Sequence, residues 1–137
     1  MASELTLGFL GAGKMATALA RGFTAAKLTS AKNLVASDVM EGARKAFADE
    51  TGVKPMPTNL AVCKAASILL LAVKPDQVAG VLAEIRAHVT AKHLLISIAA
   101  GVPLAKLEAG LAPGARVIRV MPNTPALVGA SASAFAV

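Results

Sequence analysis

Two patterns of apolar residues alternate along the sequence. Short runs such as residues 5–10 (LTLGFL) and 67–73 (SILLLAV) are apolar at nearly every position. Runs of this kind predict strands that are covered on both faces, as in a parallel sheet. Other segments repeat apolar residues every three to four positions, which predicts helices with one buried face. The clearest repeat of this second kind carries Val78, Val81, Leu82, Ile85 and Val89.

The order of these segments predicts the fold class. Helices are expected at residues 15–26, 41–50 and 78–89. A short helix that Asn59 would cap is expected as well, and another whose first turn would contain Pro103. Strands are expected at residues 5–10, 33–37, 53–56, 67–73, 94–99, 116–121 and 131–137. This alternation favours an α/β fold with an open, mainly parallel sheet and helices on both faces, the doubly wound arrangement. Ligands of such sheets bind at the carboxyl ends of strands, so the loops after the strands are the places to search for chemistry.

The loop after the first predicted strand is rich in glycine. Gly11-Ala12-Gly13-Lys14-Met15-Ala16 opens the first predicted helix and matches the G-x-G-x-x-(G/A) pattern of dinucleotide-binding turns. Gly11 would permit the tight bend, Gly13 would let the backbone approach a pyrophosphate, and Ala16 would let the helix pack on the strand. The free N–H groups at the start of the helix would then bind the phosphates. The alternative is a glycine-rich turn without a ligand.

Ser37 and Asp38 end the second predicted strand. The interval from Gly13 to Asp38 is near the roughly 20 residues that separate the glycine loop from the acid that binds the adenosine ribose. A carboxylate there accepts hydrogen bonds from ribose hydroxyls and repels a 2′-phosphate, which favours NAD over NADP. Two other interpretations remain open: Asp38 caps the helix at 41–50, or Arg44 and Lys45 still receive a phosphate.

The loop after the fourth predicted strand is Ala72-Val73-Lys74-Pro75. Pro75 stiffens this turn, and Lys74 would project toward the riboses or phosphates of a cofactor. Alternatively, Pro75 only starts a helix and Lys74 is solvated.

Two later loops also follow predicted strands. Ala99 and Ala100 leave room for a flat ring, or they simply precede a helix. Asn123 and Thr124 stand between two prolines. This rigid pair would hydrogen-bond a carboxamide or a substrate, or it forms only a stiff turn.

Composition narrows the range of functions. The chain has 137 residues, which fits one domain, and its apolar stretches are too short for a membrane span. Its net charge is +6, but the basic residues are scattered and there is no Trp or Tyr, so no nucleic-acid partner is expected. One cysteine and no visible secretory signal favour a cytoplasmic protein.

The sequence offers no clear set of residues for metal binding, thiol catalysis or acid–base catalysis. His88 and His93 have no further ligand at a suitable spacing, so no metal site is expected and both are predicted to lie at the surface. Cys63 stands in an apolar helical setting and is predicted to be a small core residue. Among the loops after strands, only Asp38 and Asp76 are acidic, so the sequence predicts a cofactor site without an obvious acid–base group.

Four motifs together resemble the Δ1-pyrroline-5-carboxylate reductase family. They are residues 8–16 (GFLGAGKMA), 71–75 (LAVKP), 99–102 (AAGV) and 117–125 (VIRVMPNTP). Their order and spacing match as well, and the resemblance covers essentially the whole chain. It implies a Rossmann-like fold and the last step of proline biosynthesis, in which NAD(P)H reduces a cyclic imine carboxylate to L-proline.

The resemblance also implies roles for individual residues. Catalytic residues would lie outside this sequence, in a helical dimerisation domain of the family that is absent here, so residues 1–137 would form the dinucleotide-binding domain alone. Asn123 and Thr124 would border the reacting ring of the substrate. The cofactor would contact Leu10, Gly11, Ala12, Gly13, Lys14, Met15, Ser37, Asp38, Asn59, Ala72, Val73, Lys74, Pro75, Ala99 and Ala100.

Asp38 departs from the family, whose members often carry a neutral or basic residue there, so the choice between NADH and NADPH stays open. We expect a homo-oligomer and little turnover by the chain alone. Two other functions remain open: a non-catalytic NAD(P)-binding sensor module, and another imine or β-hydroxyacid reductase.

Overall fold

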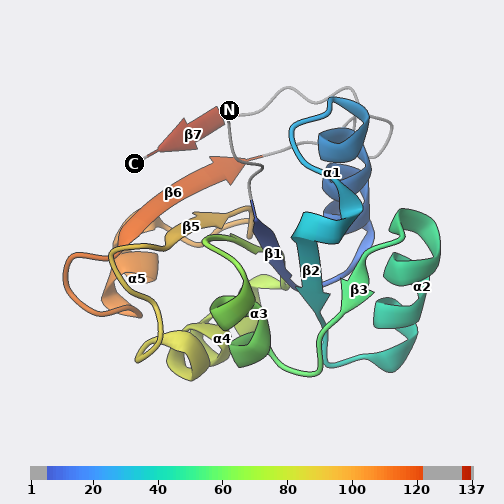
Figure 1. Ribbon diagram of the computed structural model, residues 1–137. Coiled ribbons are helices and arrows are strands. Elements are labelled where there is room, and N and C mark those ends of the chain that lie inside the picture. Colours follow the sequence, from blue (N-terminus) through green and yellow to red (C-terminus); the bar gives the residue numbers. More distant parts are fainter. Residues whose placement is uncertain (1–5, 122–133, 137) are drawn as a thin grey trace.

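The computed structural model describes residues 6–121 and 134–136 of the chain (Figure 1). Its centre is one sheet with the strand order β3-β2-β1-β4-β5-β6-β7. The first six strands in the sequence are parallel, and β7 pairs with β6 in the antiparallel direction. The strands are β1 (Leu7–Leu10), β2 (Leu34–Ser37), β3 (Lys54–Pro55), β4 (Ile68–Leu71), β5 (Leu94–Ser97), β6 (Arg116–Met121) and β7 (Ala134–Ala136).

Helices cover both faces of this sheet, which confirms the predicted doubly wound α/β class. In Figure 1, α1 and α2 lie together on one side, and α3, α4 and α5 lie on the other. The helices are α1 (Lys14–Ala25), α2 (Glu41–Thr51), α3 (Asn59–Ala65), α4 (Val78–Ile85) and α5 (Leu104–Ala109), with short 3-10 turns η1 (Ala31–Asn33) and η2 (Pro75–Gln77).

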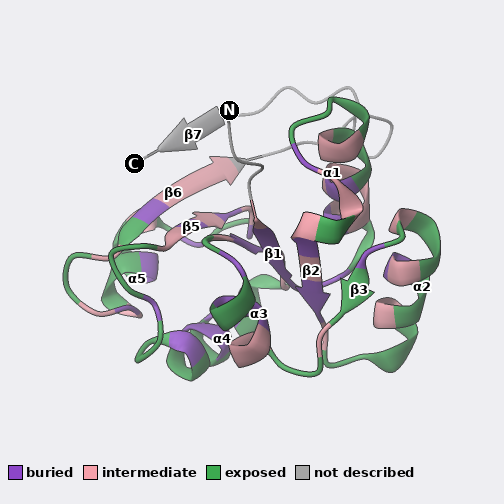
Figure 2. Ribbon diagram, in the orientation of Figure 1, coloured by how far each residue is buried: buried purple, intermediate pink, exposed green. Residues whose placement is uncertain are grey.

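The two faces of the sheet carry separate apolar cores. Alternate residues of a strand point to opposite faces, and β4 shows this directly: Leu69 and Leu71 join the core under α3, α4 and α5. Leu70 joins the other core, where Phe9 and Phe47 meet with ring centroids 5.6 Å apart. Figure 2 shows the central strands β1 and β2 as mostly buried. The continuous apolar runs in the sequence therefore reflect strands that are covered on both sides.

The predicted helix ends are only partly right. The helix predicted at residues 41–50 is α2 (Glu41–Thr51), which ends at Gly52 in a left-handed conformation (φ +72°), as helices commonly do. The predicted cap Asn59 is wrong, because the Thr58 hydroxyl accepts the hydrogen bond from the Ala61 N–H and Asn59 is the first helical residue. Pro103 is the residue before α5 and not part of its first turn.

The central strand β1 has no side chain where α3 crosses it. A Cβ atom added at Gly8 would lie 2.4 Å from Val62 Cγ1 and 3.0 Å from Ala66 Cβ. Val62 is fully buried, so it has little room to move aside. The glycine at this position therefore sets how closely α3 packs on the sheet.

Gly8→Ala is expected to lower the free energy of unfolding by about 1–3 kcal/mol, because the added methyl group overpacks the core. Gly22→Ala in α1 is the matched control, since a Cβ there meets nothing within 4 Å. It should raise the free energy of unfolding by about 0.5–1 kcal/mol through helix propensity. Urea denaturation of both variants measures the difference. Equal stability of Gly8→Ala and the parent chain would contradict the close packing.

Candidate functional site

The carboxyl ends of β1, β2 and β4 meet at one edge of the sheet. The Gly11 N–H donates to the Ser37 carbonyl (2.9 Å), and the Ala72 N–H donates to the Leu10 carbonyl (2.8 Å). On one side of β1 the next strands in the sheet are β2 and β3, and on its other side they are β4, β5 and β6. The direction in which successive strands are added therefore reverses between β1 and β4. This reversal of strand order is where open α/β sheets bind ligands.

A groove of about 590 Å³ opens at this reversal. The glycine loop forms its floor, the loop after β2 forms one wall, and the loop after β4 together with α4 forms the other. Its lining residues are Gly11, Gly13, Asp38, Val39, Met40, Ala43, Asn59, Ala72, Val73, Lys74, Gln77, Gly80, Val81 and Glu84.

The two glycines of the loop have different structural roles. Gly11 adopts φ +103°, and a Cβ there would lie 2.8 Å from the backbone of Ala72, so this position requires glycine. Gly13 precedes the first turn of α1, and a Cβ there would meet nothing within 4 Å. The space above Gly13 is therefore open to a ligand.

The start of α1 faces this open space without a partner from a side chain. No side chain caps the helix, and its first turn holds no acidic residue. Because the N–H groups of a first helical turn have no acceptor within the helix, they are available to bind an anion.

Asp38 is held in place at the adjoining wall. One carboxylate oxygen accepts from the Ala12 N–H (2.9 Å) and the other from the Met40 N–H (2.9 Å). The capping interpretation is wrong, since no side chain caps α2. Asp38 instead joins the end of β2 to the glycine loop and lines the groove.

A chain of side-chain hydrogen bonds continues from β2 across the groove. The Ser37 hydroxyl donates to Asn59 Oδ1 (2.6 Å), and Asn59 Nδ2 donates to Glu84 Oε2 (3.2 Å). The sequence pattern did not predict a role for Glu84. In the sequence, this residue shows only that it lies on the polar side of the helical repeat at 78–89.

Arg44 and Lys45, the two side chains predicted as alternative phosphate ligands, lie in different surroundings. Arg44 donates from Nη1 to the Asp38 carbonyl (2.8 Å) and so lies beside the wall of the groove. Lys45 pairs with Asp49 on exposed α2 (2.9 Å) and does not line the groove. That hydrogen bond and the charge of Asp49 raise the pKa of Lys45.

The remaining predicted residues lie in several places. Ala72, Val73 and Lys74 line the groove, and Lys74 directly precedes η2, which Pro75 begins. Leu10 is buried beneath the glycine loop, and Met15 is half-buried in the first turn of α1.

The two loops predicted to lie beyond the cofactor's middle are not part of this groove. Ala99 is buried and Ala100 is exposed, and neither is among the lining residues. Asn123 and Thr124 lie outside the described residues.

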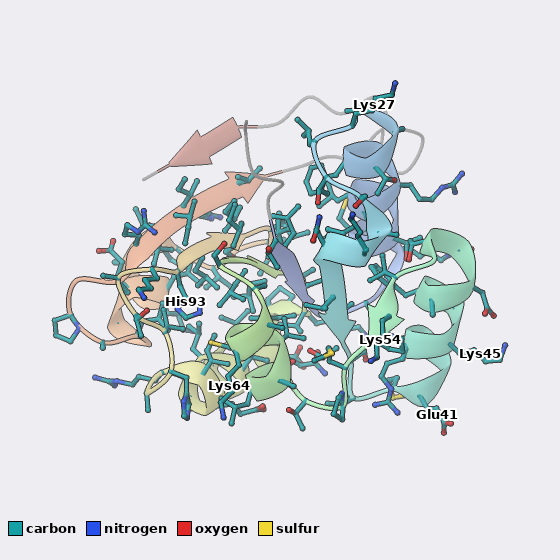
Figure 3. The ribbon with its side chains drawn as sticks, in the orientation of Figure 1. Lys27, Glu41, Lys45, Lys54, Lys64 and His93 are labelled. Carbon is teal, nitrogen blue, oxygen red and sulfur yellow. The ribbon has the colours of Figure 1, made fainter. Side chains whose placement is uncertain are left out.

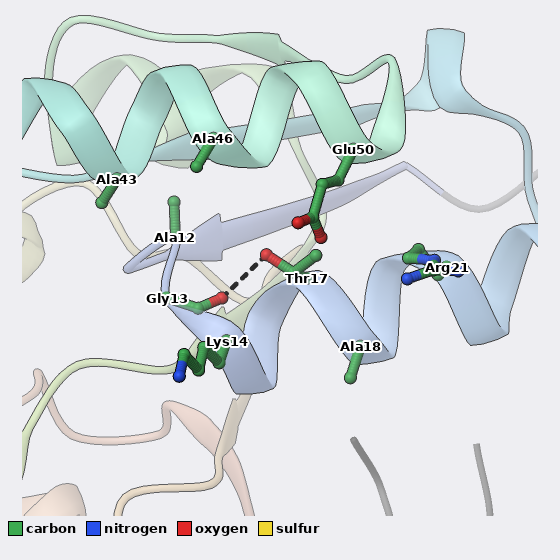
Figure 4. A pocket seen from close by; sticks show the side chains of 9 residues that line it. All are labelled: Ala12, Gly13, Lys14, Thr17, Ala18, Arg21, Ala43, Ala46 and Glu50. Carbon is green, nitrogen blue, oxygen red and sulfur yellow. Dashed lines mark hydrogen bonds between the residues drawn. The ribbon is translucent and has the colours of Figure 1, made fainter. Parts of the chain in front are cut away.

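A second hollow of about 480 Å³ lies on the other side of the glycine loop, between α1 and α2. Figure 4 shows Ala43, Ala46 and Glu50 of α2 facing α1, with the Thr17 hydroxyl bonded to the Gly13 carbonyl (2.9 Å). Ala12 and Lys14 line this hollow. It lacks Asp38 and the loop after β4, so the groove is the better candidate for a dinucleotide.

Basic side chains are spread over the molecule. Lys27, Lys45, Lys54 and Lys64 lie on separate parts of the chain in Figure 3. Within residues 6–121 and 134–136, no three His, Cys, Asp or Glu side chains gather as a metal site would require. Among the helices of residues 6–121 and 134–136, none is long and apolar enough to cross a membrane.

His93 is half-buried, which corrects the prediction that it lies at the surface. Its Nε2 lies 2.8 Å from the Cys63 carbonyl, and its Nδ1 accepts from the Thr90 N–H (2.9 Å). These bonds select the tautomer with the proton on Nε2. His88 is exposed, as predicted.

Cys63 is a core residue, as predicted. It is fully buried in the core under α3 and α4, and burial raises the pKa of its thiol. A buried thiol with a raised pKa stays protonated and unreactive near neutral pH.

Family comparison identifies the chain at a coarse level. A profile of the family described as "NADP oxidoreductase coenzyme F420-dependent" matches residues 6–101. The chain belongs to this family. It is 42% identical over 130 residues to pyrroline-5-carboxylate reductase of Methanosarcina acetivorans, covering 95% of the chain and 48% of that relative. The chain thus spans about half the length of the curated relatives it matches.

Solved structures confirm the fold. A pyrroline-5-carboxylate reductase from Coxiella burnetii superposes with a TM-score of 0.90 at 29% identity, over 97% of this chain and 49% of that one. The Plasmodium falciparum pyrroline carboxylate reductase, solved with NADP bound, superposes with a TM-score of 0.84 at 32% identity, over 96% and 47%. The chain corresponds to the N-terminal NAD(P)-binding domain of pyrroline-5-carboxylate reductases and has a Rossmann-like fold.

The thiol of Cys63 is expected to react with Ellman's reagent at pH 8 at least about tenfold more slowly in the folded chain than in urea, because labelling requires the core to open. Release of the coloured thiolate measures both rates. Fast labelling of the folded chain would contradict the burial of this residue.

Proposed function

We propose that the chain binds NAD(P)H in the groove and forms the cofactor-binding part of a pyrroline-5-carboxylate reductase. The observation that carries this proposal is the open start of α1 behind Gly13, at the point where the strand order reverses. The similarity to pyrroline-5-carboxylate reductases supports the choice of substrate.

The glycine loop and α1 would hold the pyrophosphate. The N–H groups of Lys14 and Met15 stand in the first turn, where the positive end of the helix dipole adds to the attraction. Gly13 leaves room for the close approach. The net charge of +6 favours an anionic ligand in general.

The loop after β2 would hold the adenosine end. Asp38 and Asn59 line the groove there and would meet ribose hydroxyls. Val39 and Met40 are 78% and 65% exposed, which is unusual for large apolar side chains. They and Ala43 offer an apolar surface for the adenine ring.

The loops after β4, β5 and β6 would continue along the cofactor. Val73 and Lys74 line the groove beyond the pyrophosphate. Ala99 and Ala100 would meet the nicotinamide, and Asn123 and Thr124 would border the substrate ring.

The cofactor, when bound, supplies the hydride that reduces the imine carbon, while a proton completes the amine. The chain would contribute by positioning the donor over the substrate. The acidic side chains that line the groove, Asp38 and Glu84, stand at its proposed adenosine end. As the resemblance to the reductase family implies, the contacts to the substrate carboxylate and the proton donor would come from the helical domain that members of this family carry.

A second candidate is a non-catalytic NAD(P)-binding sensor module, because the described lining of the groove holds no acidic side chain away from the loop after β2 and α4. The groove alone serves both functions, because both need only the dinucleotide. A third candidate is another imine or β-hydroxyacid reductase. The Asn123-Thr124 pair between two prolines argues against it, because such enzymes are expected to lack this pair.

Gly13→Ala is expected to weaken NADH binding by about tenfold or more, which corresponds to about 1.4 kcal/mol, because the added Cβ fills the space for the pyrophosphate. The free energy of unfolding should fall by no more than about 1 kcal/mol, since that Cβ meets no atom within 4 Å and the change costs only the difference between glycine and alanine at the N-cap of α1. Titration followed by nicotinamide fluorescence measures the dissociation constant. Gly22→Ala, in the same helix but outside the groove, should bind NADH like the parent chain. Equal binding by Gly13→Ala would count against the assigned phosphate site.

The substrate assignment is tested by adding the second half of a related pyrroline-5-carboxylate reductase as a separate polypeptide. The chain alone should reduce pyrroline-5-carboxylate very slowly, and the mixture should show reduction that depends on Gly13. Consumption of NADH and formation of proline measure the reaction, and the second half alone is the control. NADH binding without any reduction, in the mixture and in a fused chain, would favour the sensor module.

A further inference from the structure

The adenosine end of the groove opens into a hollow of about 300 Å³ beside β2. The hollow shares Asp38, Val39, Asn59 and Glu84 with the groove, so the two are continuous. Its other lining residues are Ser37, Arg44, Pro57 and Thr58. If the ribose lies against Asp38, this hollow is the space that a 2′-phosphate would enter.

The charges around this hollow do not favour a phosphate. Asp38 stands on one side, and Glu84 reaches the hollow from α4 on the other. Arg44 is the cation among its lining residues, and it already donates to the Asp38 carbonyl at 2.8 Å. Two carboxylates and one guanidinium group therefore line the hollow.

Glu84 is held at this place by a specific contact. Its Oε2 accepts from Asn59 Nδ2 (3.2 Å), while Asn59 Oδ1 accepts from the Ser37 hydroxyl (2.6 Å). Ser37 is buried at the end of β2, so the chain of bonds has a fixed end. Glu84 lies 46 residues after Asp38 in the sequence, and only the fold brings it to the ribose end.

We propose that Glu84 is a specificity-determining residue that, together with Asp38, disfavours cofactors carrying a 2′-phosphate. This inference rests on the proposed dinucleotide function of the groove. A phosphate monoester carries a charge of about −1.5 to −2 at neutral pH. Like charges within a few ångströms repel strongly near a protein surface, and salt weakens this repulsion. Glu84 therefore penalises NADPH and leaves NADH, which has a hydroxyl at that position, nearly unaffected.

The test is titration of the full chain with NADH and NADPH, and with 5′-ADP and 2′,5′-ADP as probes that lack the nicotinamide. Glu84→Gln should tighten NADPH and 2′,5′-ADP by about three- to tenfold relative to NADH and 5′-ADP. Glu84→Lys should extend this change. High salt should weaken the binding of all four ligands to the parent chain. It should also reduce the ratio of the affinity for the unphosphorylated ligands to that for the ligands with a 2′-phosphate, because it screens the repulsion.

Glu108→Gln is the matched control, because it removes the same charge from an exposed position on α5 that lines neither the groove nor the hollow. It should leave the ratio of the two affinities unchanged. Circular dichroism and a urea midpoint confirm that each variant folds.

The outcomes separate this inference from the proposed function. An unchanged ratio in folded Glu84→Gln and Glu84→Lys overturns the inference, while NADH binding still supports the groove. Equal weakening of NADH and NADPH also overturns it, since Glu84 would then act only by orienting Asn59. Failure of the folded parent chain to bind any of the four ligands overturns both.

Discussion

The close approach of the turn after β1 to its neighbours is the contact on which the site depends. Gly11 lies so near the Ala72 backbone that no Cβ fits between them, and its N–H bonds to Ser37 at the end of β2. Asp38 then accepts from the next N–H, that of Ala12. Because one turn touches the ends of both adjacent strands, the groove walls and the start of α1 converge on a single place.

The two apolar cores make this approach rigid. Gly8 lets α3 pack on β1 from one side, and Phe9 of the same strand joins the core under α1 and α2 on the other. Apolar burial on both faces stabilises a central strand by its area removed from water. The polar chemistry is therefore confined to the carboxyl edge, where the backbone leaves the sheet and its N–H groups become available to a ligand.

Much of the fold could be predicted because its signals are local. The strand β6 (Arg116–Met121) was predicted with the same ends, and the helix predicted at residues 41–50 runs only one residue further, to Thr51. The cap of α3 was wrong by one residue, since Thr58 and Asn59 are both good capping residues and only the backbone geometry distinguishes them. His93 looked like a surface residue, but the chain reversal before β5 lays its ring against the Cys63 carbonyl.

The sequence by itself determined the alternation of strands and helices, the parallel sheet, the glycine loop and the resemblance to a reductase family, because hydrophobic periodicity and glycine placement act within short segments. The tertiary structure decided which residues meet at the β2 side of the groove. It joins Asp38 to Ala12 and brings Glu84 to Asn59. Such meetings depend on strand order and on the path of each crossover helix, which no local pattern encodes. Only the folded chain therefore shows that a second carboxylate, that of Glu84, lines the groove with Asp38.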